Sequence, residues 1–258
     1  MELLRLYISE LKKIKKTLAL LLAVSAPLLV VIFMVLMVTN YETRSVDPKM
    51  WESFINQICL FWTALMSPLY ISIELGLLSE LEFANNNWKL VLSQPVSKAN
   101  AYLAKMMTAI SLILFSNVVL FLGTIVAGSV LGVVRPDLGF AQSSLDLSGF
   151  STVIALSFLA SFLIIAIHTW LSVRFRSFVI SVVIAVFAVV GNVMAVGSSQ
   201  FQKFFPWIFP FDIVKILKLS EGAAGDGVTI GYVLLFSIIG AMCVTLLGVI
   251  DISRRDVP

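Results

Sequence analysis

Long apolar runs separated by short polar segments dominate this chain of 258 residues. A helix needs about 20 mostly apolar residues to cross a hydrocarbon layer of about 30 Å. The runs that meet this length cover residues 17–39, 53–78, 101–130, 150–173, 178–196 and 229–250. The pattern therefore predicts an all-α integral membrane protein with six transmembrane helices, folded as a single transmembrane domain over residues 1–258.

Composition supports a membrane location and narrows the classes of function. Hydrophobic residues make up 59% of the chain and charged residues 13%, against about 45–50% and about 25% in soluble proteins. No basic stripe interleaved with aromatic residues is present, so nucleic-acid binding is not expected. Cys59 and Cys243 lie in apolar runs without a second cysteine or a histidine nearby, so neither a metal nor a redox site is expected.

Residues 1–16 have the pattern of an amphipathic helix. Apolar residues recur there at spacings of three and four, and lysine and arginine occupy the other faces. A basic helix of this kind lies in the headgroup plane. The alternative is the charged region of a cleaved signal peptide, but the next apolar run has the length of a full span and no small-x-small cleavage site closes it. A retained interfacial helix is favoured.

The placement of lysine and arginine predicts the orientation. With the N-terminus in the cytoplasm, the cytoplasmic segments hold 12 of the 18 basic residues, as the positive-inside rule requires. An even number of spans then returns the C-terminus to the cytoplasm as well.

The polar stretch 73–105 stands out between two apolar runs. Glu74, Glu80 and Glu82 are expected to close the second span at the cytoplasmic surface, and the asparagines at 85–87 to break the helix. A short helix parallel to the membrane is predicted over 82–95, with Ser97 capping the next helix. The candidate residues for contact with a partner are Glu82, Asn85, Trp88, Lys89, Leu92 and Pro95. An ordinary interfacial loop anchored by Trp88 is the alternative.

Residues 201–219 form a second unusual segment, rich in aromatic side chains and interrupted by Pro206 and Pro210. The segment is too short and too interrupted to span the membrane. It is interpreted as a pair of extracellular re-entrant or interfacial helices, with Trp207 at headgroup level.

Sequence motifs of enzymes are absent. The chain has no phosphate-binding loop, dinucleotide fingerprint, nucleophile elbow or zinc-protease motif. Among the polar residues within the predicted spans, three are candidate site residues: Asn117, His168 and Asn192. Two roles are open for Asn117 and Asn192: they line a substrate path, or they form hydrogen bonds between neighbouring helices. For His168 the alternatives are a proton relay and, favoured here, a packing residue held by a hydrogen bond. The spans are otherwise almost uncharged, which argues against ion-coupled transport and leaves the chain without its own energy source.

Two motifs carry a resemblance to a known family. The first is Glu82, Asn85, Trp88, Lys89, Leu92, Ser93, Pro95, Ser97 and Lys98, and the second is Pro206-Trp207-Ile-Phe-Pro210 before the last apolar run. Together with the basic N-terminal helix and the predicted spans, they resemble ABC exporter permeases of the type-2 class, in particular the bacterial lantibiotic-immunity subunits.

The resemblance implies a location, partners and a substrate. Residues 1–16 are then the elbow helix, and residues 82–95 the coupling helix that docks on a cassette ATPase in the bacterial plasma membrane. Two ATPase subunits, which bind ATP and Mg²⁺, and a second permease subunit, the same chain or a sister, complete the transporter. No catalytic residue, metal or cofactor is expected in this chain itself. A lantibiotic-like or other amphipathic peptide is the implied substrate, and membrane lipid surrounds the complex. The alternatives are a permease for a lipid or drug, a membrane sensor or scaffold of an antimicrobial-peptide response, and an intramembrane enzyme.

Overall fold

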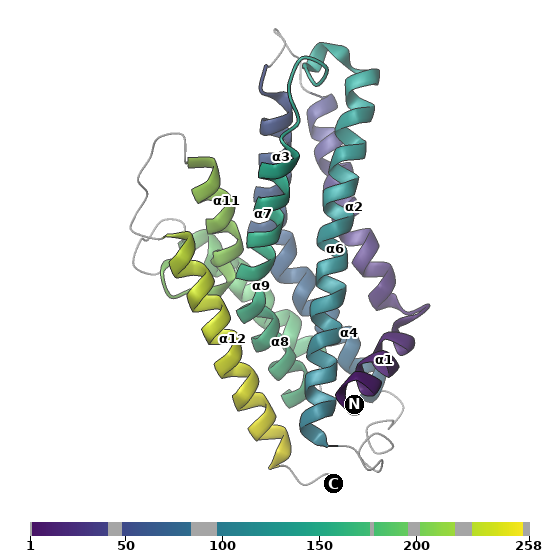
Figure 1. Ribbon diagram of the computed structural model, residues 1–258, viewed down its shortest axis with the longest axis vertical. Coiled ribbons are helices and arrows are strands. Elements are labelled where there is room, and N and C mark those ends of the chain that lie inside the picture. The colour runs from purple at the N-terminus through teal and green to yellow at the C-terminus, as the bar shows by residue number, and fades with distance from the viewer. Residues whose placement is uncertain are drawn as a thin grey trace.

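A computed structural model describes residues 2–40, 48–83, 97–175, 178–195, 202–219 and 229–254, and these ranges contain helices but no β-strand. The helices form one elongated bundle, and α6 runs through most of its length (Figure 1). The elements of the first half are α1 (Glu2–Ile14), α2 (Leu18–Thr39), α3 (Met50–Phe61), η1 (Trp62–Met66), α4 (Ser67–Phe83) and α6 (Lys98–Val134). The second half contains η2 (Pro136–Leu138), α7 (Leu147–Ala160), α8 (Phe162–Phe175), α9 (Phe178–Ala195), η3 (Pro206–Ile208), α11 (Phe209–Leu219) and α12 (Ile230–Ser253).

Five helical segments of the described chain are long and apolar enough to cross a membrane: Leu18–Thr39, Met50–Glu80, Lys98–Val134, Leu147–Phe175 and Ile230–Ser253. They correspond to five of the six predicted spans. The remaining predicted span, 178–196, is the helix α9, whose apolar part Phe178–Asn192 is shorter than the other five. The all-helical membrane fold is therefore confirmed, and the sixth crossing stays a prediction.

Two of these spans are not continuous α-helices. In the second span, the π-helical segment η1 separates α3 from α4. In the fourth span, α7 ends at Ala160 and α8 begins at Phe162. The Ser161 hydroxyl between them donates to the carbonyl of Phe158 at 2.6 Å. Neither break is visible as a change in hydrophobicity, and neither was predicted.

The bundle is apolar outside and carries polar side chains inside. Large apolar side chains are exposed along α2, α6, α9 and α12, among them Leu29, Leu122, Phe187 and Leu246. Hydroxyl, amide and ionisable side chains are buried between the helices instead. Lipid solvates an apolar surface, whereas polar groups need partners inside the protein. This distribution is the one expected of a membrane domain.

Three glycines of the long third span, Gly123, Gly128 and Gly132, allow close packing. Gly128 lies directly under the ring of Trp51 from α3, because a Cβ atom placed there would stand 2.4 Å from that ring. Gly123 faces Leu28 and Val31 of α2. The three small positions of this helix therefore receive different neighbours, since Gly132 faces Phe140 beyond η2.

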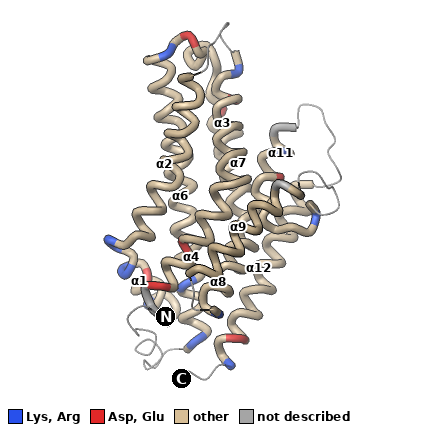
Figure 2. Tube along the Cα trace, turned by 180° about the vertical axis from the view of Figure 1, so that it is seen from behind, with Lys and Arg blue, Asp and Glu red and all other residues tan. Residues whose placement is uncertain are grey.

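The charged residues gather toward the two ends of the bundle (Figure 2). One end, here called the α1 end, carries α1, the start of α6 and the end of α12 (Figure 1). There α1 packs on α6, and the hydroxyl groups of Tyr7 and Ser111 lie 2.7 Å apart in a hydrogen bond. The opposite end carries η2, where Arg135 forms an ion pair with Asp137 at 2.7 Å. Which end faces the cytoplasm stays a prediction, as does the role of α1 as an elbow helix.

Candidate functional site

The π-helical segment η1 lies at the centre of a polar network between the helices. In a π-helix the backbone bonds span five residues, and such turns are frequent at functional sites. The carbonyl oxygen of Ala64 in this segment accepts a hydrogen bond from Nδ2 of Asn192 on α9, at 3.1 Å. The widened turn thus binds a side chain of a helix that lies far from it in the sequence.

Asn192 connects three elements. Its Nδ2 also donates to the carbonyl oxygen of Trp207 in η3, at 3.3 Å. Its Oδ1 is buried and has no hydrogen-bond partner among the described residues. Asn192 therefore holds α9 against both η1 and η3, and it retains one acceptor for a group outside the described chain.

His168 joins the same network from α8. The indole Nε1 of Trp207 donates to Nε2 of His168 at 3.2 Å, and Nδ1 of the ring lies 3.2 Å from the hydroxyl of Ser181 on α9. An Nε2 atom that accepts a hydrogen bond carries no proton, so the neutral ring holds its proton on Nδ1 and donates it to Ser181. The side chain is fully buried, so the geometry favours the packing role over a proton relay.

Asn117, on α6, also contacts η1. Its Oδ1 accepts from Nε1 of Trp62 at 3.3 Å, and its Nδ2 donates to the carbonyl of Ile113 at 2.8 Å. Both ends of this amide are thus satisfied by protein groups, as expected for a residue that bonds neighbouring helices. The structure brings His168, Asn192 and Trp207 into one cluster, and Asn117 of α6 hydrogen-bonds to Trp62 of the same π-helical segment.

The segment around Pro206 and Pro210 folds as two short helices, in agreement with the predicted break. Pro206 begins η3, and Pro210 lies in the first turn of α11, where the missing amide hydrogen costs nothing. The carbonyl of Pro210 accepts from the hydroxyl of Ser157 on α7 at 3.4 Å. These contacts tie the segment to α7 as well as to α8 and α9; its extracellular location stays a prediction.

Asp212 of α11 lies in this segment and is almost fully buried. Gln202 donates a hydrogen bond to Oδ1 of Asp212, and Oδ2 has no partner among the described residues. Burial raises the pKa of Asp212 to about 6, and the Gln202 bond and the charge of Lys215 partly oppose this rise. Asp212 thus titrates near neutral pH in a segment that was singled out only for its aromatic residues.

The predicted coupling helix is only partly within the described chain. Glu82 lies in the last turn of α4, so this helix continues past the predicted start of the segment at 82. Asn85, Trp88, Lys89, Leu92 and Pro95 lie outside the described residues. Beyond them, the hydroxyl of Ser97 accepts from the amide of Asn100 at 3.4 Å and caps α6, as predicted.

Glu74 lies inside the bundle and not on its surface, contrary to the expectation from the sequence. It is fully buried in α4, and both carboxyl oxygens lack a hydrogen-bond partner in the described part of the chain. The prediction was wrong because α4 continues for nine residues beyond Glu74, to Phe83. The spans are therefore not free of ionisable groups.

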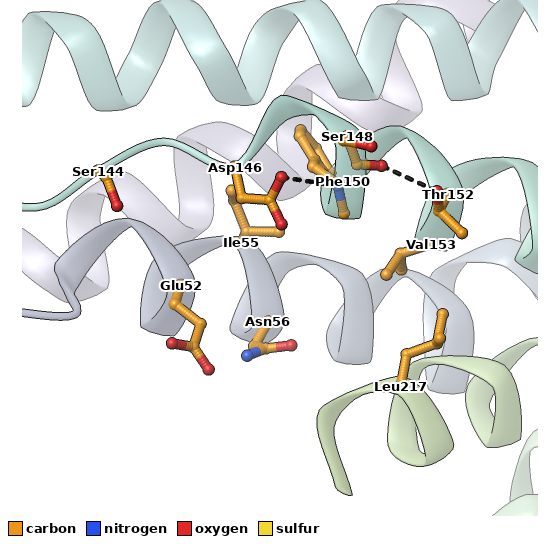
Figure 3. Close-up of a pocket in the computed structure, with 11 residues that line it drawn as sticks. Glu52, Ile55, Asn56, Ser144, Asp146, Ser148, Phe150, Thr152, Val153 and Leu217 are labelled. Atoms are coloured by element: carbon orange, nitrogen blue, oxygen red, sulfur yellow. Dashed lines mark hydrogen bonds between the residues drawn. The ribbon is translucent and has the colours of Figure 1, made fainter. Parts of the chain in front are cut away.

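A cavity of about 730 Å³ opens between α3, α7 and α11 (Figure 3). Its polar lining includes Glu52 and Asn56 of α3 and Asp146 at the start of α7. Ile55, Phe150, Val153 and Leu217 supply its apolar lining. No pattern in the sequence indicated this cavity, because its two acidic residues lie at the starts of two helices far apart in the chain.

The two acidic residues of the cavity differ in the contacts that their carboxylates make. Oδ1 of Asp146 accepts from the amide of Gly149 at 2.9 Å and caps α7, so this carboxylate is held in place. Glu52 lies 3.7 Å from Lys49 and is half exposed, so its carboxylate remains accessible. Two carboxylates beside an apolar wall suit a ligand that is both cationic and apolar.

Comparison with known proteins identifies the family. The family model described as ABC-2 family transporter protein matches residues 6–192, which include α2 to α8 and most of α1 and α9. No curated protein matches the chain. The family model covers well over half of the sequence and includes four of the five apolar spans. It agrees with the resemblance to type-2 ABC permeases. The chain belongs to the ABC-2 family of transporter proteins.

Proposed function

We propose that this chain is the transmembrane subunit of an ATP-driven exporter that expels a lantibiotic-like or other amphipathic cationic peptide from the bacterial plasma membrane. The observation that carries this function is the family match over residues 6–192, since membership implies partnership with an ATPase subunit. The sequence contains no phosphate-binding loop, so ATP and Mg²⁺ bind to the partner.

The cavity between α3, α7 and α11 supports the choice of substrate class. Glu52 and Asp146 supply negative charge, and Ile55 and Phe150 supply an apolar wall. A peptide that carries a lysine or an arginine next to apolar side chains complements both the negative charge and the apolar wall. With both termini in the cytoplasm, this cavity faces the outside and receives the peptide as it leaves the membrane.

Coupling to the ATPase is assigned to the segment between α4 and α6. In this proposal residues 82–95 form the coupling helix, and two ATPases act on two permease subunits, either identical or from a sister chain. Closure of the ATPases around ATP pushes this segment, and α4 and α6 transmit the movement to the bundle. The contact of Tyr7 with Ser111 places α1 beside the start of α6, which suits an elbow helix that follows this movement.

The test is co-purification of this permease with a cassette ATPase from the same bacterium. Trp88→Ala and Glu82→Ala are expected to weaken binding of the ATPase and to lower its stimulated ATP hydrolysis while the permease still inserts. Glu10→Ala on α1 removes a carboxylate at the same end of the bundle, where it pairs with Lys13, and is expected to leave both readouts unchanged. Normal binding and hydrolysis in both coupling variants would show that the docking assignment is wrong. A permease that binds no ATPase but binds a signalling protein would be a sensor instead.

A further inference from the structure

Glu74 is an ionisable residue inside a span that nothing in the proposed transport mechanism uses. It lies in α4, about two turns after the π-helical segment, and its side chain is 0% exposed. Neither Oε1 nor Oε2 has a hydrogen-bond partner among the described residues. A polar group buried in this way normally has a partner, so this one requires an explanation.

The helices that pack against α4 offer the carboxyl group little charge compensation. Among them, α2 and α9 carry no titratable side chain in their described residues. The titratable groups of the remaining neighbours are His168 and Arg174 on α8 and Lys98, Tyr102 and Lys105 on α6, and α4 itself also carries Tyr70, Glu80 and Glu82. None of them hydrogen-bonds to Glu74.

Three of these groups, His168, Arg174 and Tyr70, have other partners. His168 bonds to Trp207 and Ser181, and Arg174 pairs with Asp251 of α12 at 3.0 Å. The hydroxyl of Tyr70 shares a hydrogen bond with Ser116. An ionised carboxylate without a partner is far more costly to bury than a neutral carboxylic acid. The surroundings therefore favour the protonated form of Glu74.

We propose that Glu74 is a proton-binding site of the permease, which holds a proton in the conformation described here, where α4 is packed against its neighbours, and releases it to water when α4 separates from them. The step breaks one O–H bond of the carboxylic acid, and the proton passes to a water molecule that enters beside α4. Closing reverses it, because the carboxylate must take up a proton before it is buried again. Acidic conditions therefore favour the packed arrangement of α4 over the open one. This inference does not depend on which substrate is transported.

The bound proton is tested by infrared spectroscopy of the full-length permease in lipid nanodiscs at neutral pH. The wild type is expected to show the C=O band of a protonated carboxylic acid, and Glu74→Gln is expected to lose most of this band; the part that remains comes from Asp212, whose pKa is about 6. Glu52→Gln is the control, because Glu52 is half exposed and its loss should leave the band unchanged. Identical spectra of the wild type and Glu74→Gln in the carboxylic-acid region would overturn the proposal.

A labelling experiment covers the case in which Glu74→Gln fails to fold. Dicyclohexylcarbodiimide, an apolar reagent, adds to protonated carboxyl groups, and mass mapping of the wild type is expected to find the adduct at Glu74 but not at Glu52. No adduct at Glu74 at any pH at which the protein is folded would contradict a bound proton.

Release of the proton is tested by the pH dependence of opening. Spin labels are placed at Glu80 and Ser253, which are exposed on α4 and α12, in a chain whose Cys59 and Cys243 are replaced by alanine. The open fraction is expected to rise with pH in this background and to stay low and independent of pH when Glu74→Gln is added. An equal pH dependence with and without Glu74→Gln would show that the proton is not linked to opening.

Discussion

Trp207 donates a hydrogen bond from its indole Nε1 to Nε2 of His168 across 3.2 Å, and this bond fixes the short helices η3 and α11 to the centre of α8. The two rings meet edge to face, with centroids 6.0 Å apart. Asn192 holds the backbone of the same tryptophan. The segment formed by η3 and α11, which lies between the last two predicted spans, is thus attached to the polar centre of the bundle.

Removal of the indole donor should weaken this attachment. Trp207→Phe keeps an aromatic ring but leaves Nε2 of His168 without a donor, so we expect a loss of about 1–2 kcal/mol. A double-mutant cycle with His168→Leu, followed by thermal unfolding in detergent, should give a coupling of at least about 0.5 kcal/mol. Trp170→Phe is the matched control, since its indole bonds to Asp251 instead, and its effect should add to that of His168→Leu. Additive effects of Trp207→Phe and His168→Leu would mean that the bond contributes nothing.

Gly128 should tolerate no side chain. The Trp51 ring above it is held by a bond from its Nε1 to the carbonyl of Phe140 at 3.1 Å, so it cannot move aside easily. Gly128→Leu should therefore destabilise the protein by about 1–3 kcal/mol through overpacking. Gly231→Ala in α12 is the control, because a Cβ atom there meets nothing within 4 Å, and helix propensity predicts no loss. Equal melting temperatures for Gly128→Leu and the wild type would contradict the close contact.

Stability should depend on pH through Asp212. Its pKa is about 6 in the folded protein against an ordinary value of 3.8, so the folded state binds more protons between these values. The free energy of unfolding is therefore highest below about pH 4 and falls by roughly 2–3 kcal/mol as the pH rises through 6. Asp212→Asn should remove this loss, as measured by thermal unfolding from pH 4 to 7. Gln202→Leu removes a hydrogen bond that lowers the pKa of Asp212, so the loss of stability should extend to higher pH. A loss that moves to lower pH in this variant would contradict the role given to Asp212.

Glu52 should contribute to peptide binding at the cavity between α3, α7 and α11. Because this carboxylate is half exposed, its charge is screened, and Glu52→Gln should weaken binding of a cationic amphipathic peptide about two- to fivefold. The loss should shrink at high salt. Asp137→Asn at the same end of the bundle removes a carboxylate outside the cavity and should leave the affinity unchanged. Microscale titration of the permease in nanodiscs measures both, and an equal effect of the two variants would exclude the cavity as the binding site.

The sequence predicted the spans well because the length of an apolar run is set by the thickness of the bilayer. It also located the cap at Ser97 and the interruption at Pro206, since both depend on local chemistry. The π-helical turn at Trp62–Met66 could not be predicted, because it depends on a partner, Asn192, that lies on another helix.

The sequence also did not indicate which face of each helix turns toward the interior of the bundle. Spans that are apolar on every side give no signal for the face that turns inward, so the burial of Glu74 and the meeting of His168 with Trp207 depended on tertiary packing. The cavity at Glu52 and Asp146 has the same origin, because its walls come from three helices.

The most direct test of the account is uptake of a fluorescent cationic amphipathic peptide by inside-out vesicles that contain this permease and its cassette ATPase. We expect uptake that requires ATP and stops when the lysine of the ATPase phosphate-binding loop is replaced. ATP hydrolysis by a stable complex without any peptide uptake, across a panel of lantibiotics and related peptides, would contradict the assignment of this chain as a peptide exporter.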